Sequence, residues 1–108
     1  MNLLQLKEKI KKGIDLGAKV VYIKEDSLLF GIEAILFNEE DNNIVFIKSK
    51  EEGIKSEDFI DIIDERYNQV GNIDAYVGKE SKYRSEDRPI AYVEFAQYEE
   101  IKMLFLNA

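Results

Sequence analysis

Apolar and polar residues alternate along most of this chain, and the pattern is clearest around its longest apolar run, Leu28 to Phe37. The length of this run and its β-branched and aromatic content are typical of a central β-strand. Because successive side chains of a strand point to opposite faces, one face is expected to be wholly apolar and to look into the core. That face would consist of Leu28, Phe30, Ile32, Ala34 and Leu36.

Two segments carry apolar residues at the spacing of an amphipathic helix. The first covers residues 3–14, and Gly17 is expected to follow its C-terminus. The second is predicted from Glu57 to Val70, with Ser56 as its N-cap and Gly71 after it.

Alternation predicts four further strands, over residues 18–24, 44–48, 73–78 and 89–96. Residues 97–106 fit a helix or a strand, and their good helix formers favour a helix. These elements predict an α+β fold, a mainly antiparallel sheet of about five strands with two or three helices packed on one face. We expect a single domain, residues 1–108.

The same alternation predicts which residues look away from the helices. They are Leu29, Glu33, Ile35, Phe37, Asp74, Tyr76, Tyr92 and Glu94. This face is too apolar and aromatic for a sheet that meets only water, because aromatic residues are enriched in the cores of interfaces. We expect the C-terminal segment, a partner protein or a second copy in a homodimer to cover it.

The composition excludes several functions. A net charge of −7 and a pI near 4.7 argue against direct nucleic-acid binding, which depends on Lys and Arg that neutralise phosphates. The chain has no His and no Cys, so the common catalytic nucleophile pairs and zinc sites are not expected. No phosphate-binding or dinucleotide motif is present, so we expect no cofactor and no enzymatic activity. No apolar run reaches the ~18 residues of a membrane span, so we expect no membrane partner and a cytoplasmic location.

Two loops are open to more than one interpretation. The polar stretch from Asn38 to Asn43 is rich in oxygen ligands but lacks the glycine and distal glutamate of a calcium-binding EF-hand loop. We expect it to be a solvated hairpin turn without a metal. The charged loop from Lys79 to Arg88 surrounds a single Tyr83, and a loop of this length is either functional or mobile.

The strongest candidate partner-binding residues are acidic and aromatic. On the second helix, Asp58, Asp61, Asp64 and Glu65 share one face with only Arg66 to offset them, a slightly unfavourable arrangement on its own. We expect this face to dock on a basic surface of another protein. The candidate aromatic contacts are Tyr76, Tyr83 and Tyr92.

A short Leu-rich helix, the segment Ala-Lys-Val-Val-Tyr-Ile and a meander containing Asp-Asn-Asn-Ile-Val-Phe-Ile open the chain. This opening resembles small single-domain proteins of phages and mobile elements. The resemblance implies an accessory or regulatory role, such as antagonism of a host protein, and it carries over no functional residue. The sequence thus favours a non-enzymatic inhibitor that covers a basic, nucleic-acid-binding surface. The alternatives are an enzyme that uses only the carboxylates Glu33 and Glu94, and a self-associating accessory protein.

Overall fold

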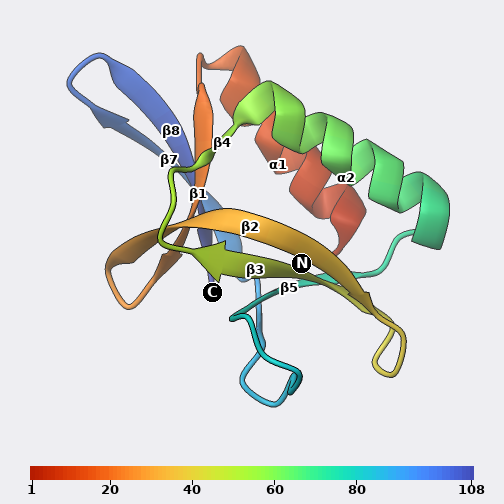
Figure 1. The fold of residues 1–108 in the computed structure, drawn as a ribbon. Helices are drawn as coiled ribbons and strands as arrows, with labels where there is room; N and C mark the ends of the chain where they lie inside the picture. The colour runs from red at the N-terminus through yellow and green to blue at the C-terminus, as the bar shows by residue number, and fades with distance from the viewer.

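The computed structural model describes residues 1–108 and has an α+β fold, with two helices on one side of a curled mixed sheet (Figure 1). The helices are α1, Leu3–Asp15, and α2, Ser56–Val70. The strands are β1 Val20–Glu25, β2 Leu28–Asn38, β3 Asn43–Ser49, β4 Ile54–Lys55, β5 Asp74–Gly78, β6 Arg88–Pro89, β7 Tyr92–Tyr98 and β8 Ile101–Asn107. The predicted fold class is confirmed in this coarse form.

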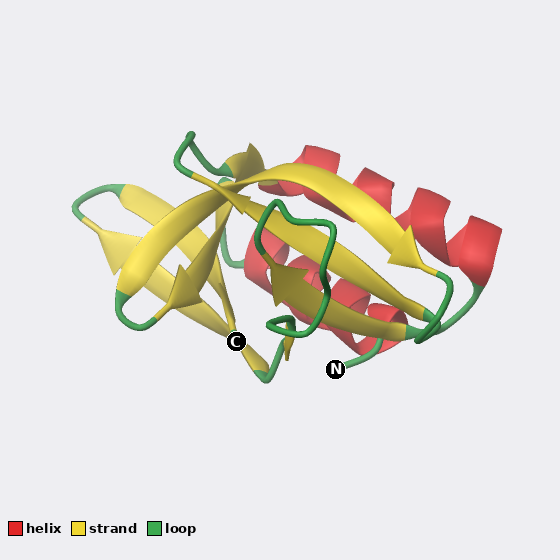
Figure 2. Cartoon of the chain, turned by 60° about the horizontal axis from the view of Figure 1, so that its bottom comes forward, coloured by secondary structure: helices red, strands yellow, loops and turns green.

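The strands follow the order β6-β5-β3-β2-β1-β8-β7, and β4 pairs with β1. The predicted antiparallel hairpins β1–β2 and β2–β3 are confirmed. Two pairs, β3 with β5 and β1 with β8, are parallel, so the prediction understated both the number of strands and their mixed directions. The connection from β3 to its parallel neighbour β5 runs through β4 and α2, which is the long crossover that parallel strands need. Figure 2 shows the curled sheet in front of the two helices.

The C-terminal segment is a strand, so the preference for a helix over residues 97–106 was wrong. Strand β7 continues to Tyr98, a turn follows at Glu99 and Glu100, and β8 returns beside β1. Residues Leu104 to Asn107 are all buried. A strand that is covered on both faces carries an unbroken apolar run, which does not show the alternation of a half-exposed strand.

A β-bulge in β2 corrects the predicted face of the central strand. Ile32 pairs with Lys48 and Ala34 pairs with Ile47, which leaves Glu33 as an extra residue. The extra residue reverses the alternation, so the side chains that pack against the core are Phe30, Ile32, Ile35 and Phe37. Ala34 is exposed and Leu36 lies on its side of the strand, so their predicted core positions were wrong. Leu28 comes before the bulge, but it is 62% exposed at the end of the strand, so its predicted core position was wrong as well.

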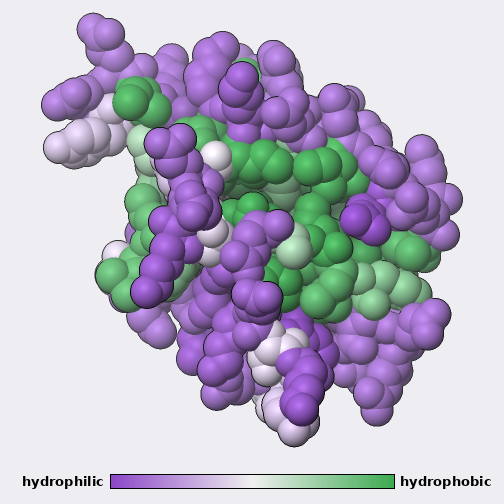
Figure 3. Space-filling view, in the orientation of Figure 1, coloured by the Kyte–Doolittle hydropathy of each residue, from purple (hydrophilic) through white to green (hydrophobic).

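The core fills the space between the helices and the sheet. Phe46 of β3 and Phe59 of α2 meet there with ring centroids 5.3 Å apart, and both are buried. Along β2 the apolar layer is only half covered, and Figure 3 shows an apolar band on the surface between α2 and β2.

The helix ends agree only partly with the predicted caps. Gly17 and Gly71 follow α1 and α2 with positive φ angles of 98° and 83°, as predicted for residues after a helix. Helix α1 starts with a capping box between Asn2 and Gln5. The prediction of Ser56 as the N-cap of α2 was wrong, because Ser56 is the first helical residue and its buried hydroxyl oxygen has no hydrogen-bond partner.

Candidate functional site: an acidic pocket beneath the sheet

The outer face of the sheet, away from the helices, brings polar residues of β3 and β5 together. The two strands are parallel, with Asn43 beside Asp74 and Val45 beside Tyr76. Their neighbours Ile44, Ala75 and Val77 are part of the core. Asp74 and Tyr76 therefore lie on the outer face, as alternation predicts.

Residues 79–88 form a compact loop that folds across this outer face, as Figure 2 shows. Its ends lie close together, because Val77 pairs with Arg88 in the β5–β6 ladder. Inside the loop, the Arg84 guanidinium donates from Nη2 to the carbonyl oxygens of Lys79 and Ser81, at 2.9 and 2.6 Å. Its Nε donates to the carbonyl oxygen of Tyr83 at 3.2 Å. Arg84 is thus the group around which the loop is ordered.

A polar pocket of about 340 Å3 lies between this loop, the β2–β3 turn and β5. We call it the acidic pocket, and its lining residues are Asp41, Asn43, Asp74, Tyr76, Arg84 and Asp87. It brings together three carboxylates and one guanidinium, and the guanidinium is already engaged by loop carbonyls. The pocket therefore has a negative charge.

Asp87 is the most unusual ionisable group of the pocket. Its side chain is 7% exposed, and its carboxylate lies against Gly78, where the absence of a Cβ makes room for it. Burial raises the pKa of the Asp87 carboxyl, the Arg84 charge lowers it in part, and the Asp41 charge raises it further. An ionisable group perturbed in this way, in a pocket, is a candidate functional group.

A neighbouring polar cavity of about 420 Å3 differs because three carboxylates and three cations line it, so it has no net charge. Lys48 binds Glu25 at 2.6 Å, and Lys79 binds Glu86 at 2.5 Å. The hydrogen bond and charge of Lys79 lower the pKa of the Glu86 carboxyl. We regard these as structural ion pairs, and Asp87 and Arg88 are the two other charged residues that line the cavity.

The predicted partner-binding residues do not form one surface. Asp58, Asp61 and Glu65 are exposed on α2, and Asp64 forms an ion pair with Lys7 of α1 at 2.5 Å. Helix α1 lies beside α2, and its Lys7 and Lys11 offset part of the acidic charge for which the sequence predicted a basic partner.

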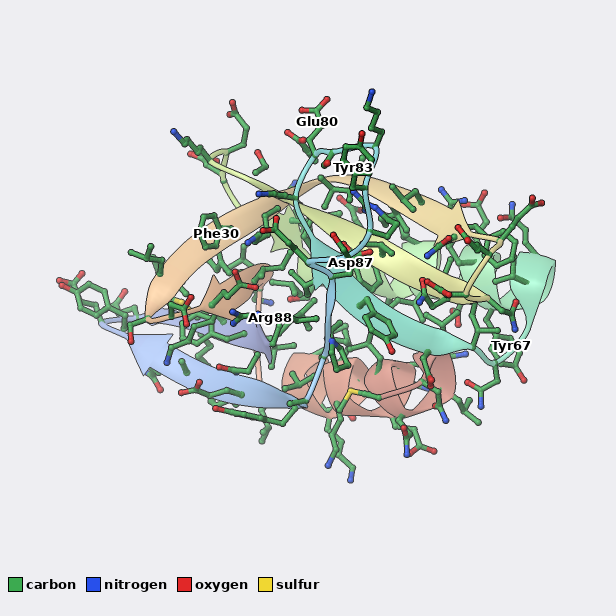
Figure 4. The ribbon with its side chains drawn as sticks, turned by 90° about the horizontal axis from the view of Figure 1, so that it is seen from below. Phe30, Tyr67, Glu80, Tyr83, Asp87 and Arg88 are labelled. Atoms are coloured by element: carbon green, nitrogen blue, oxygen red, sulfur yellow. The ribbon has the colours of Figure 1, made fainter.

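The predicted tyrosines lie elsewhere, and they are also separated from one another. Tyr76 lines the acidic pocket and Tyr83 is exposed on the loop above it, whereas Tyr92 is on β7 in the other half of the sheet. Figure 4 shows Asp87 beneath the middle of the sheet, with Tyr83 and Glu80 at the far end of the loop.

The carboxylates of the alternative enzymatic interpretation also lie apart. Glu33 is exposed at the bulge of β2, and strands β1 and β8 lie between β2 and β7, which carries Glu94. Glu94 accepts from Lys24 and from Asn107, both at 3.4 Å. The two carboxylates form no catalytic pair.

Sequence reasoning did not identify the acidic pocket, although it pointed to its parts. It singled out the acidic turn with Asp41, the outer face with Asp74, and the loop with Arg84 and Asp87. What joins them is the parallel register of β3 and β5, which depends on the packing of α2 and cannot be read from strand patterns alone.

Comparison of the chain with protein-family models, curated proteins and solved structures finds no match. The resemblance to small phage and mobile-element proteins therefore stays a prediction. Neither helix has the length and apolar character needed to cross a bilayer.

Proposed function

We propose that this protein is a non-enzymatic binding module that docks on a basic surface of another protein through the acidic end of its outer sheet face. The acidic end consists of Glu39, Glu40, Asp41, Asp74 and Asp87. The observation that carries the proposal is the charge imbalance of the acidic pocket, where Arg84 is the only cation among three carboxylates.

Electrostatics makes such a surface suited to recognition. A surface with charge of one sign attracts a partner of opposite sign and accelerates the encounter, most strongly at low salt. A Lys- and Arg-lined groove that binds nucleic acid is a fitting partner, and covering it would inhibit the host protein. That regulatory role agrees with what the resemblance of the N-terminal half implies.

Two charge-reversed variants separate this surface from the face of α2. One carries Glu39→Lys and Glu40→Lys, and its matched control carries Asp61→Lys and Glu65→Lys, with the same change in net charge. Each is immobilised beside the wild-type chain in an extract of the native host, and retained proteins are identified by mass spectrometry.

We expect a basic protein that the wild type and the α2 variant retain and the turn variant loses. Its association with the wild type should slow steeply as salt increases. Equal retention by all three proteins, or loss only with the α2 variant, would contradict the proposal.

Self-association is a second candidate, because one edge of the sheet is free. Strand β7 pairs only with β8, and Tyr92, Tyr98 and Ile101 of this hairpin are more than half exposed. A long edge strand with exposed apolar side chains is a template for pairing with a second copy. Sedimentation equilibrium tests this, since a dimer that Tyr98→Glu disrupts would support it and a monomer at all concentrations would exclude it.

A further inference from the structure

Two acceptor atoms of the acidic pocket are buried without a hydrogen-bond donor. They are Asn43 Oδ1 and Asp87 Oδ2, and they come from different elements of the fold. Asn43 is 6% exposed and the Asp87 side chain is 7% exposed. A buried acceptor without a donor costs about 1–3 kcal/mol, so both atoms favour a ligand that supplies hydrogen-bond donors.

The charge of the pocket requires those donors to be cationic. Asp41, Asp74 and Asp87 contribute three negative charges, against the single positive charge of Arg84. The Nη1 atom of Arg84 is buried without a hydrogen-bond acceptor and lies 3.6 Å from Asp87 Oδ1. The Arg84 charge is therefore shared with one side of Asp87 and leaves the Oδ2 side free.

The arrangement suits a guanidinium better than a metal ion or an ammonium. Although three carboxylates line the pocket, they are not grouped so that they could hold a metal ion. An ammonium is a compact, strongly hydrated charge, whereas a guanidinium is planar, weakly hydrated and has five donors that reach separate acceptors. Tyr76 adds an aromatic wall, on which a guanidinium can stack.

We propose that the acidic pocket binds the guanidinium group of an arginine side chain on the partner protein. This inference rests on the proposed function and adds to it which residue of the basic surface enters the domain. Asp87 accepts from the arginine at Oδ2, Asn43 accepts at Oδ1, and the carboxylates of Asp41 and Asp74 hold the charge from the rim.

Nuclear magnetic resonance of the full chain tests the proposal with small probes. The probe is Nα-acetylarginine N-methylamide, and the matched controls are the corresponding citrulline and lysine derivatives. Citrulline has the shape of arginine without the charge. We expect saturable amide shifts in residues 41–43, 74–76 and 84–87 with arginine, at least tenfold weaker binding with lysine, and none with citrulline.

Two variants test whether Asp87 contributes to binding of the arginine probe. Asp87→Asn should weaken arginine binding at least tenfold, whereas Glu100→Gln, an exposed carboxylate at the β7–β8 turn, should leave it unchanged. Absence of saturable shifts, equal binding of citrulline, or stronger shifts of the same amides with Ca2+ would overturn the proposal.

The two proposals can fail separately. If a basic protein is retained by the wild type and equally well by Asp87→Asn, the arginine site is wrong while the docking surface stands. If the arginine probe binds as expected but no basic protein is retained, the proposed function fails and the site remains.

Discussion

Arg84 Nη1 and Asp87 Oδ1 lie 3.6 Å apart, too far for a hydrogen bond, although both side chains are largely buried. The other guanidinium nitrogens of Arg84 donate to carbonyl oxygens of its own loop, so Arg84 cannot turn to complete the pair. The Asp87 carboxylate is thus held in a buried place with an incomplete partner. Groups that are unfavourable for stability and retained in a pocket are typical of functional sites.

Asp87→Asn should stabilise the protein at neutral pH. Because burial raises the pKa of Asp87 in the folded state, the folded protein binds this proton more tightly than the unfolded chain. Stability therefore falls as the pH rises from about 4, the ordinary pKa of Asp, through the raised pKa. The asparagine removes this loss, so urea denaturation should give a higher midpoint for the variant at pH 7 and no difference below about pH 4.

The groups that face Asp87 set the control for this experiment. They are Arg84, Asp41, Asp74 and Tyr76 in the acidic pocket, and Glu25, Lys48, Lys79, Glu86 and Arg88 in the neighbouring cavity. Asp74→Asn removes an exposed carboxylate from the same pocket and should change the midpoint less. If Asp87→Asn lowers the midpoint at pH 7, the ion pair with Arg84 outweighs burial and our assignment of Asp87 is wrong.

The residues of the acidic pocket could be predicted from the sequence only where a local strand pattern places them. Local patterns placed Asp74 and Tyr76 on the outer face, because alternation within one strand is a local property. The position of Arg84 inside its loop depends on bonds to carbonyl groups of Lys79 and Ser81. Any arginine can donate to backbone carbonyl groups, so no pattern of residues predicts these hydrogen bonds.

The fold shows the same division between local and non-local information. Both helices and the β1–β2–β3 meander follow from periodicity, since each buries one face. The bulge at Glu33 cannot be predicted from periodicity, because an extra residue in β2 is defined only by its pairing with β3. One shifted residue exchanged the faces of Ala34 and Ile35.

Two substitutions in β2 after the bulge test the corrected face. Ile35→Asp places a carboxylate among side chains that pack against the core and should destabilise the protein by about 2 kcal/mol or more. Ala34→Asp, on the exposed side of the strand, should cost less than about 1 kcal/mol. Chemical denaturation measures both, with Glu33→Gln as a neutral control at the exposed bulge. A larger loss for Ala34→Asp than for Ile35→Asp would restore simple alternation.

Gly13→Ala tests the packing of α1 on β8. In an exposed helix this change stabilises by up to about 1 kcal/mol. Here the new methyl group would overlap the side chain of Leu104, which is 1% exposed and has little room to move. Overpacking costs about 1–3 kcal/mol, so the net effect should be destabilising. The loss should shrink in a Leu104→Val background, and an equal loss in both backgrounds would show that the two residues are not in contact.

Arg84→Lys tests whether the loop and the acidic pocket depend on one guanidinium. A lysine keeps the charge but cannot reach the carbonyl groups of Lys79, Ser81 and Tyr83 together, since its ammonium is a single donor centre. Loss of these charge-assisted bonds should cost about 1.5–3 kcal/mol, and it should act mainly on the loop. Hydrogen exchange should then quicken at residues 79–88 and stay slow in β3. Binding of the arginine probe should also weaken, because Asp87 is no longer held in place.

Lys82→Ala is the matched control, because Lys82 is an exposed cation of the same loop that lies over the Tyr83 ring. Unchanged exchange in Arg84→Lys, or equally fast exchange in Lys82→Ala, would show that Arg84 does not order the loop.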